Sequence, residues 1–446
     1  MPDPNAFFPR NFRREYLIAS RGEGCYIYTP DGRKILDAAG GAAVVSIGHG
    51  VREIGEAMAR QSQDLAFAHT SQFHTEAAHR LASRIQQLTP PGMRDTARVF
   101  FTCGGSEATE TAIKLAHQYW RACGKPGRYR IVSRRQSYHG ATLGALSLSG
   151  NVLRREPFAP LLHEWGHIAP CFCYRCPLGL AYPDCRVACA DELEKMFAAP
   201  DAESIGAFIA EPVVGATLGA VAPPDGYAQR IAEICRRNDI LFIADEIMCG
   251  MGRTGKNFAI EHWGVTPDII LVGKGIASGY APLGAVIVSD KICEAIARDS
   301  GAFLHGFTYN AHPVSVAAGL AVLDYIEKHK LFGRVAPTGR ELLGALEALK
   351  KFSIVGDVRG LGLLCAVEFV ADAGTRAPFA DSLGIADRVY RAALERGVTT
   401  YPMQGVADGT RGDHLLLAPP FTISSAEIRE LSAALSSAIA EVSASL

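Results

Sequence analysis

The sequence predicts an α/β protein in which a mostly parallel sheet lies between helices. Two short apolar runs carry this prediction, because Leu241–Ala244 stops at Asp245 and Ile269–Val272 stops at Gly273 and Lys274. Such runs are typical of strands buried in a parallel sheet. The length of 446 residues and the hydrophobic content of 48% allow a large domain and a smaller one.

The two runs bring an acid and an amine to the same edge of the predicted sheet. Open α/β sheets place their chemistry at the carboxyl ends of the strands, where Asp245 and Lys274 stand. A lysine that leaves a buried strand can have a lowered pKa and act as a nucleophile. A lysine that forms a Schiff base and an acid that keeps a pyridine nitrogen protonated indicate pyridoxal phosphate (PLP) as cofactor. Taken singly, each residue is more typical of an ion pair or a surface charge.

Composition and charge exclude several other classes of protein. The 45 basic and 46 acidic residues give a net charge of −1, which predicts neither a nucleic-acid partner nor an acidic membrane surface. No run approaches the roughly 18 apolar residues that a membrane-spanning helix needs. The N-terminal residues do not resemble a signal peptide. With no secretory signal, the twelve cysteines predict free thiols and a cytoplasmic location.

The first hundred residues predict a hairpin and then two helices. The alternation around Tyr26–Tyr28, followed by a turn at residues 30–32, indicates the hairpin. Residues 52–89 predict two amphipathic helices with a break near His69–Phe73. A short strand at Val99–Thr102 then leads into a helix whose small apolar residues lie near one face.

The turn between that strand and that helix is the predicted phosphate site. Backbone N–H groups at a glycine-rich helix N-terminus can converge on an anion, and the helix dipole favours it. Gly105 and Ser106 are therefore predicted to hold the phosphate of the cofactor. A bare loop is the alternative when this turn is considered alone.

Two further strand ends supply an aromatic residue and a second acid. Tyr138 follows a strand at residues 131–132 and can stack on a pyridine ring. His139, beside it, either supports Asp245 or packs in the core. Glu211 ends the next apolar run, and the proline after it stops the strand.

A cysteine-rich insertion is predicted at about residues 165–190. The segment Cys171–Cys189 contains one Cys-x₂-Cys pair, Cys173 with Cys176, and such pairs are typical of zinc sites. A second clean pair is missing, so we predict a thiol-rich loop and no metal ligands. A structural metal held by this loop is the alternative.

Several phrases of the sequence together resemble one known family. IADEIMCGMGRTG, DIILVGKGIASGYAPLGAV and GGSEATETAIKLA are similar to the motifs of the class III aminotransferases, also called the ω-amino acid or subgroup II group, of PLP fold type I. The resemblance covers nearly the whole chain. It implies a seven-stranded sheet in a large PLP-binding domain at residues 61–328. It also implies a smaller α/β domain built from residues 1–60 and residues 329–446.

The resemblance implies roles for the residues at matching positions. Lys274, Asp245, Tyr138 and Glu211 would be the catalytic residues. The cofactor would be bound by a larger set that includes His139: Gly105, Ser106, Tyr138, His139, Glu211, Asp245, Ile247, Lys274 and Thr308. Within that set, Tyr138 and Ile247 would enclose the ring.

Three of the implied roles concern substrate and partner. Thr308 matches a residue that binds the phosphate of the neighbouring subunit, which implies a homodimer with shared active sites, with a dimer of dimers as a further assembly. Arg411 is the candidate for binding the α-carboxylate of a substrate. Phe73 is the candidate for an apolar pocket that receives the amine.

The function implied by the resemblance is transamination. A PLP-dependent, ping-pong enzyme would move an amino group from an ω-amino acid or primary amine to a 2-oxo acid, either pyruvate or 2-oxoglutarate. A racemase, an aminomutase or a decarboxylase of the same fold would use the same Asp245 and Lys274, so these residues do not separate the alternatives. A non-catalytic homologue that binds PLP is a third hypothesis.

Overall fold

The computed structural model describes residues 6–446 and contains a seven-stranded sheet. The strand order is β4-β10-β9-β8-β7-β5-β6. The pairs among the last five strands are parallel, whereas β10 is antiparallel to both β4 and β9. The predicted seven-stranded, mostly parallel sheet is therefore confirmed. Its strands are β4 (Arg98–Thr102), β5 (Arg130–Arg134), β6 (His167–Ile168), β7 (Ile205–Ala210), β8 (Leu241–Asp245), β9 (Ile269–Val272) and β10 (Gly284–Val288).

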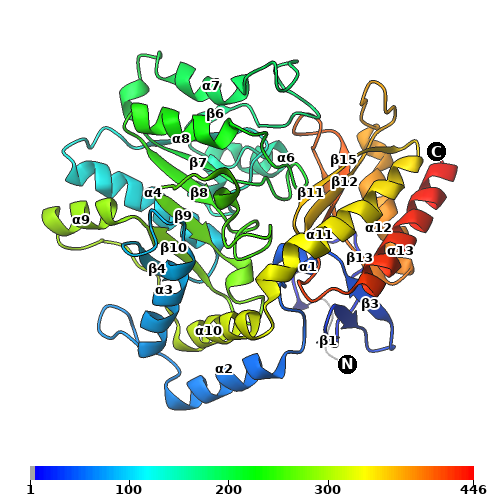
Figure 1. Cartoon of the computed structure of the whole chain (residues 1–446), viewed down its shortest axis with the longest axis horizontal. Coiled ribbons are helices and arrows are strands. Elements are labelled where there is room, and N and C mark those ends of the chain that lie inside the picture. The colour runs from blue at the N-terminus through cyan, green and yellow to red at the C-terminus, as the bar shows by residue number, and fades with distance from the viewer. Residues whose placement is uncertain (1–5) are drawn as a thin grey trace.

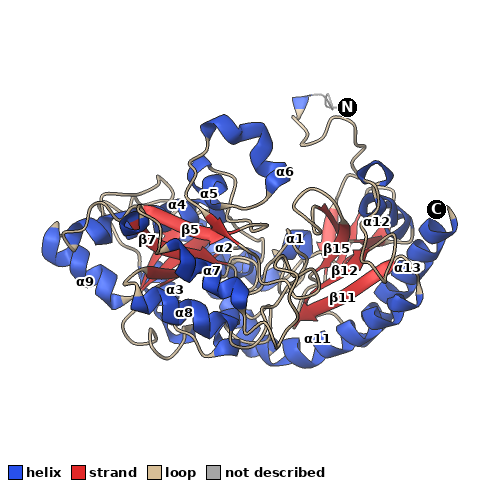
Figure 2. Cartoon of the chain, turned by 90° about the horizontal axis from the view of Figure 1, so that it is seen from above, coloured by secondary structure: helices blue, strands red, loops and turns tan. Residues whose placement is uncertain are grey.

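The central strands of this sheet are continuous apolar runs because both of their faces are covered. Every residue of β7, β8, β9 and β10 is buried. Helices lie on both sides of the sheet (Figure 2). They include α3 (Glu76–Leu88), α4 (Gly105–Ala122), α5 (Leu143–Leu148), α6 (Val152–Arg155), α7 (Ala188–Met196), α8 (Tyr227–Arg237) and α9 (Asp290–Asp299).

The N-terminal and C-terminal parts of the chain lie together in a second lobe (Figure 1). One sheet has the order β1-β2-β3-β13 and joins the two ends of the chain, because β13 pairs in parallel with β3. Another has the order β11-β12-β15-β14. The domain boundaries near residues 60 and 328 stay a prediction. The elements are β1 (Arg21–Glu23), β2 (Tyr26–Tyr28), β3 (Lys34–Asp37), β11 (Val355–Leu361), β12 (Leu364–Phe369), β13 (Val398–Thr399), β14 (Tyr401–Gln404), β15 (Asp413–Leu417), α11 (Leu331–Glu347), α12 (Ile385–Glu395) and α13 (Ser425–Ala444).

The predicted elements appear near their predicted positions. The helices expected over residues 52–89 are α2 (Arg52–Asp64) and α3. The stretch VRGLGLLCAVEFV forms the two antiparallel strands β11 and β12. The turn between them places Gly362 at φ +61°, where a Cβ atom would lie 2.6 Å from the backbone carbon of Thr254. None of the described helices is both long enough and apolar enough to cross a membrane.

A buried arginine ties three distant segments to the seven-stranded lobe. Arg253 is only 2% exposed and donates hydrogen bonds to the carbonyl oxygens of Val45, Leu363 and Pro419. No carboxylate pairs with it among residues 6–446. Burial lowers the pKa of Arg253 to about 9. The turn α1 (Gly40–Ala43) also lies between the two lobes in both views (Figures 1 and 2).

Candidate active site

A cavity of about 280 Å³ lies at the carboxyl ends of β8 and β9. The register of these parallel strands places Asp245 opposite Leu271, so the chain that leaves β9 passes close to the acid. The cavity brings together eight of the residues predicted from the sequence: Gly105, Ser106, Tyr138, His139, Glu211, Asp245, Ile247 and Lys274.

Lys274 is the amine of this cavity, and its backbone is strained. It begins the short 3-10 turn η5 (Lys274–Ile276) with φ at +44°, a conformation that costs a non-glycine residue about 1–3 kcal/mol. Its Nζ atom donates to the carbonyl oxygen of Ala42 across 2.9 Å. Burial lowers the pKa of Lys274 to about 8, although the charges of Asp245 and Glu211 oppose the shift. The ε-amino group is therefore a better nucleophile near neutral pH than a surface lysine.

The carbonyl group that meets Lys274 comes from the left-handed turn α1. All four of its residues, Gly40–Ala43, have φ between +53° and +68°. Two of these residues are alanines, for which this conformation is costly. Gly40 is needed because a Cβ atom there would lie 2.4 Å from the carbonyl oxygen of Ala418. Packing against the C-terminal part of the chain therefore holds the turn that positions Ala42.

Asp245 is buried and held by two hydrogen bonds. Its Oδ2 atom lies 2.7 Å from Nδ1 of His139, and its Oδ1 atom accepts from the backbone N–H of Ile247 across 3.1 Å. His139 thus contacts Asp245, which is the first of the two alternatives that the sequence left open for this histidine. The adjacent Glu246 points elsewhere, since its carboxylate accepts from the backbone of residues 259 and 260. Asp245 thus lines the cavity, whereas Glu246 holds the turn at residues 259 and 260.

Glu211 links the wall of the cavity to Tyr138. Its Oε1 atom accepts from the backbone N–H of Tyr138 across 3.0 Å, and its Oε2 atom accepts from Gly215 across 2.8 Å. Burial raises the pKa of Glu211. The guanidinium carbon of Arg154 lies 4.7 Å from the centre of the Tyr138 ring. Backbone bonds therefore fix the position of this tyrosine, while its ring is only partly buried.

The N-terminus of α4 forms the other end of the cavity. Its N-cap residue is Gly104, which offers no side chain to the first N–H groups of the 18-residue helix. Ser106 Oγ accepts from the backbone N–H of Ala141 across 3.0 Å. A Cβ atom at Gly105 would lie 2.8 Å from Cδ1 of Ile247, so glycine keeps the helix end open. Such an end suits a phosphate group.

These residues fit pyridoxal phosphate. The cavity offers an amine at Lys274, a buried acid at Asp245 and an anion-binding helix end at Gly105, as the cofactor's aldehyde, ring nitrogen and phosphate require. Tyr138 and Ile247 both line the space between. The Nε2 atom of His139 is buried and has no hydrogen-bond partner among the described residues.

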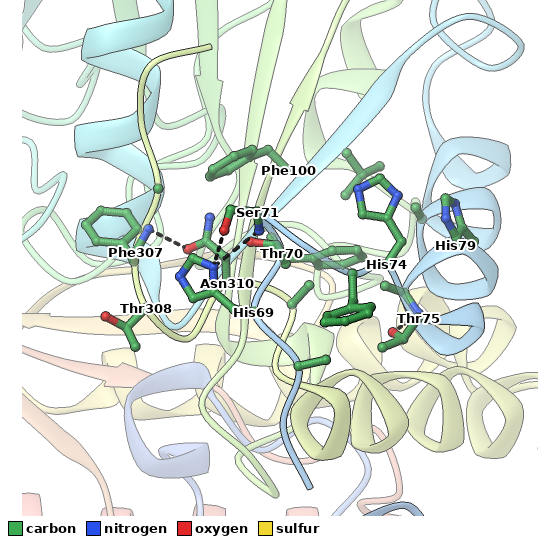
Figure 3. A pocket seen from close by; sticks show the side chains of 18 of the residues that line it. His69, Thr70, Ser71, His74, Thr75, His79, Phe100, Phe307, Thr308 and Asn310 are labelled. Carbon is green, nitrogen blue, oxygen red and sulfur yellow. Dashed lines mark hydrogen bonds between the residues drawn. The ribbon is translucent and has the colours of Figure 1, made fainter. Parts of the chain in front are cut away.

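Thr308 and Phe73 lie in a different, wider cavity of about 660 Å³. Figure 3 shows Thr308 beside Phe307 and Asn310, facing His69 and Ser71 of the segment between α2 and α3. The side chain of Asn310 accepts from the backbone N–H of Phe307 across 3.1 Å. Phe73 is 64% exposed. Within one chain, neither Thr308 nor Phe73 lines the cavity of Lys274.

Arg411 does not line the cavity of Lys274 either. It is exposed, and its Nε atom donates to Oδ2 of Asp408 across 2.7 Å. Two other arginines, Arg10 and Arg154, line the cavity instead, together with Tyr401 of β14. Sequence reasoning missed them because no motif surrounds them and neither stands at a strand end; Arg154 lies in the short helix α6.

The cysteine-rich insertion packs beside the second lobe. Arg175, within it, pairs with the buried Glu368 of β12. A small space of about 20 Å³ is lined by Cys171, Cys173, Cys176, Cys185 and Cys189. All are free thiols, and burial raises the pKa of Cys189 to about 12. Among residues 6–446 no group of three or more histidine, cysteine, aspartate or glutamate side chains is arranged to hold a metal ion.

Comparisons with known proteins match the chain along nearly all of its length. The family model described as aminotransferase class-III matches residues 7–439. The uncharacterized aminotransferase YodT of Bacillus subtilis is 42% identical, and the match covers 97% of this chain and 96% of YodT. The diaminobutyrate–2-oxoglutarate transaminase of Halomonas elongata is 35% identical, with 96% of this chain and 91% of that protein covered. A solved amine transaminase from an uncultivated Pseudomonas species, in its PLP-bound form, has a TM-score of 0.90 at 37% identity and covers 99% of this chain and 98% of its own.

Proposed function

The chain belongs to the class III aminotransferase family, and from this premise we propose that Lys274 holds pyridoxal phosphate while an amino group moves from an ω-amino acid or primary amine to a 2-oxo acid. One observation carries the proposal. The lowered pKa of Lys274 and the buried Asp245–His139 pair occur in one cavity that ends at an open helix N-terminus. The family and its relatives are transaminases, which favours transamination over the racemase, aminomutase, decarboxylase and non-catalytic alternatives.

The residues of the cavity divide the chemistry among them. When bound, pyridoxal phosphate supplies an aldehyde for the donor amine and a ring that withdraws electrons. Lys274 would act as general base at the carbon that bears the donor nitrogen, and then as general acid that delivers the proton to the former aldehyde carbon of the cofactor. Asp245, backed by His139, keeps a proton on the ring nitrogen. The acceptor, pyruvate or 2-oxoglutarate, follows the same route in reverse, which makes the reaction ping-pong.

The other residues of the cavity bind and orient. Gly105 and Ser106 present the N-terminus of α4 to the phosphate. Tyr138 and Ile247 enclose the ring, and Glu211 fixes Tyr138 through its backbone N–H group. Arg411 stays a candidate for a substrate α-carboxylate, and that role requires its loop to leave Asp408 and turn inward.

The wide cavity around Thr308 supports a homodimer. Exposed apolar side chains accompany it, including Phe73 at 64%, Leu304 at 85% and Tyr309 at 59% exposure. A second copy of the chain that covers this face would bring Thr308 to the phosphate in the partner's cavity. Phe73 would reach the shared site in the same way. The twelve free cysteines support a location in the reducing cytoplasm.

The test is the absorbance spectrum of the PLP-loaded protein during addition of single amines. The panel is taurine, β-alanine, 4-aminobutyrate, putrescine, 1-phenylethylamine and alanine. We expect at least one amine to convert the absorbance of the aldehyde form into that of the amine form, and pyruvate or 2-oxoglutarate to restore it. Lys274→Ala should lose the absorbance band of the lysine-bound cofactor and all turnover, whereas Lys291→Ala, a surface lysine paired with Asp268, should keep both. Full activity of Lys274→Ala would disprove the assignment.

A further inference from the structure

In the described part of the chain, the guanidinium group of Arg154 has no polar partner. This distinguishes it from the charged groups of Asp245, Glu211 and Lys274 in the same cavity. Asp245 bonds to His139, Glu211 accepts two backbone N–H groups and Lys274 donates to a carbonyl group. Within residues 6–446, the guanidinium group of Arg154 makes no hydrogen bond and no ion pair. Five N–H donors of one side chain are therefore available at the wall of the cavity.

The position of Arg154 is fixed even though its donors are free. Its backbone N–H bonds to the side chain of Asn151 across 3.0 Å at the start of α6. Its guanidinium carbon lies 4.7 Å from the centre of the Tyr138 ring, which holds the side chain by a cation–π contact. A guanidinium group in such a contact can still use its N–H groups to bind an acid.

The neighbouring arginine shows the opposite arrangement. Arg155 donates to the carbonyl oxygens of Leu146, Ser147 and Ser149, and it pairs with Glu164. Its function is thus to hold the loop after α5. Of the two consecutive arginines, only Arg154 lines the cavity and only Arg154 keeps its donors free.

We propose that Arg154 binds an acidic group of the amino donor, so that the donor is an amine with a carboxylate or sulfonate at the end away from the reacting nitrogen. The inference rests on the proposed function and narrows its donor class. A planar guanidinium group binds two oxygens of such an acid at once. Arg10, at the same cavity, adds positive charge that attracts the acid.

The test compares donors of matched length that differ in the acidic group. β-Alanine carries a carboxylate, taurine a sulfonate and propylamine neither. The measured quantity is the second-order rate constant for conversion of the aldehyde-form absorbance in a single turnover. Arg154→Gln should lower this rate constant about 30-fold for the two acidic donors, mainly because they bind more weakly. For propylamine the rate constant should fall less than about twofold. Arg154→Lys, which keeps the charge and loses the planar fork, should lie between.

Control variants and a binding measurement complete the design. Arg298→Gln removes an exposed arginine of α9 and should change none of the three constants. Propanoate is an acid without an amine, and its dissociation constant by calorimetry should rise about 30-fold in Arg154→Gln. Comparison of the rate constants for taurine and β-alanine shows whether the site prefers a sulfonate or a carboxylate.

Several results would overturn the inference while leaving transamination intact. An equal loss for propylamine would mean that Arg154 only positions Tyr138. A loss of PLP affinity without a change in donor selectivity would assign Arg154 to the phosphate. A selective loss in Arg411→Gln but not in Arg154→Gln would place the acid at Arg411. If no donor converts the cofactor, the proposed function fails, and propanoate binding still decides the role of Arg154.

Discussion

The cavity around Lys274 and the cavity around Thr308 are built in different ways. In the first, of about 280 Å³, a polar group from one segment usually meets a partner from another, as Asp245 meets His139. In the second, of about 660 Å³, Asn310 bonds to Phe307 within its own segment, His305 contacts Thr111 and Lys114 of α4, and aromatic side chains such as Phe73 are exposed. In the first cavity the amine, the acid and the helix N-terminus all come from one chain. The second has the character of a surface that another surface covers.

This difference separates residues that one family resemblance had grouped together. Lys274 and Thr308 were both predicted as cofactor ligands, yet they lie in different cavities of the same chain. A residue that serves a neighbouring subunit should lie outside the cavity of its own chain, which is where Thr308 is. A substitution at Thr308 should therefore act on the site of the neighbouring subunit, whereas a substitution at Lys274 should act on the site of its own chain.

The largest effect is expected from the acid of the complete cavity. Asp245→Asn keeps the shape of the side chain and removes the charge that holds a proton on the ring nitrogen. Turnover should fall by about 10²- to 10³-fold in a steady-state assay with saturating PLP. A melting curve shows whether the protein remains folded. Near-normal turnover in a folded variant would show that the Lys274 cavity does not need the charge of Asp245.

A smaller effect is expected from closing the helix end. At Gly105 a Cβ atom would lie 2.8 Å from Cδ1 of Ile247, whereas at Gly104 it would meet nothing within 4 Å. Gly105→Ala should weaken PLP binding by about tenfold or more, since overpacking costs about 1–3 kcal/mol. Gly104→Ala is the matched control. Equilibrium dialysis measures the PLP affinity of both variants. Equal affinities would contradict the role of Gly105 in phosphate binding at the N-terminus of α4.

The incomplete cavity is probed by Thr308→Val, which removes a hydroxyl group and keeps the volume. We expect PLP affinity to fall about fivefold to tenfold, which is within the range of an ordinary net hydrogen bond of about 0.5–1.5 kcal/mol. Co-expressed chains make the test specific. A mixed dimer of Lys274→Ala with Thr308→Val would contain one intact site if Thr308 acts across the interface. Failure of the mixed dimer to recover normal affinity would place Thr308 outside the site.

The smallest effect concerns the pH dependence of PLP uptake by the apoprotein. Only the neutral amine of Lys274 attacks the aldehyde, and burial lowers the pKa of Lys274 to about 8 from the usual 10.5. Lowering the pKa makes the neutral form available at lower pH, so the uptake rate should rise about fivefold between about pH 7 and pH 8 and level off above. A stopped-flow absorbance series measures it. A rate that keeps rising towards pH 10.5 would show that the cavity leaves Lys274 like a surface lysine.

The fold was predictable because its signals are local. The apolar runs that end at Asp245 and Lys274 indicate buried strands by themselves, and parallel strands place their ends at one edge. Ser424 and Glu427 form a capping box at the start of α13, which is another local signal. The sharp turn at Gly362 between β11 and β12 is not a local signal, because it depends on Thr254, about one hundred residues away.

The site was predictable only where strand ends form it. His139 had two open alternatives from the sequence, since a contact 106 residues away in the chain leaves no periodic signal. Arg154 and Arg10 were missed because no motif surrounds them and neither stands at a strand end. Arg411 was named by resemblance, and its position beside Asp408 comes from a local turn that the motif does not describe.

The contacts of Arg253 have a consequence for protein synthesis. This side chain needs carbonyl groups from residues 45, 363 and 419, and the last of these emerges only when nearly the whole chain has been translated. Until then a cation in the middle of the chain lacks part of its final environment. The lobe that holds Lys274 therefore lacks part of its final packing on the ribosome until the C-terminal part has emerged. Nascent chains released before about residue 419 should need chaperones more than longer chains do.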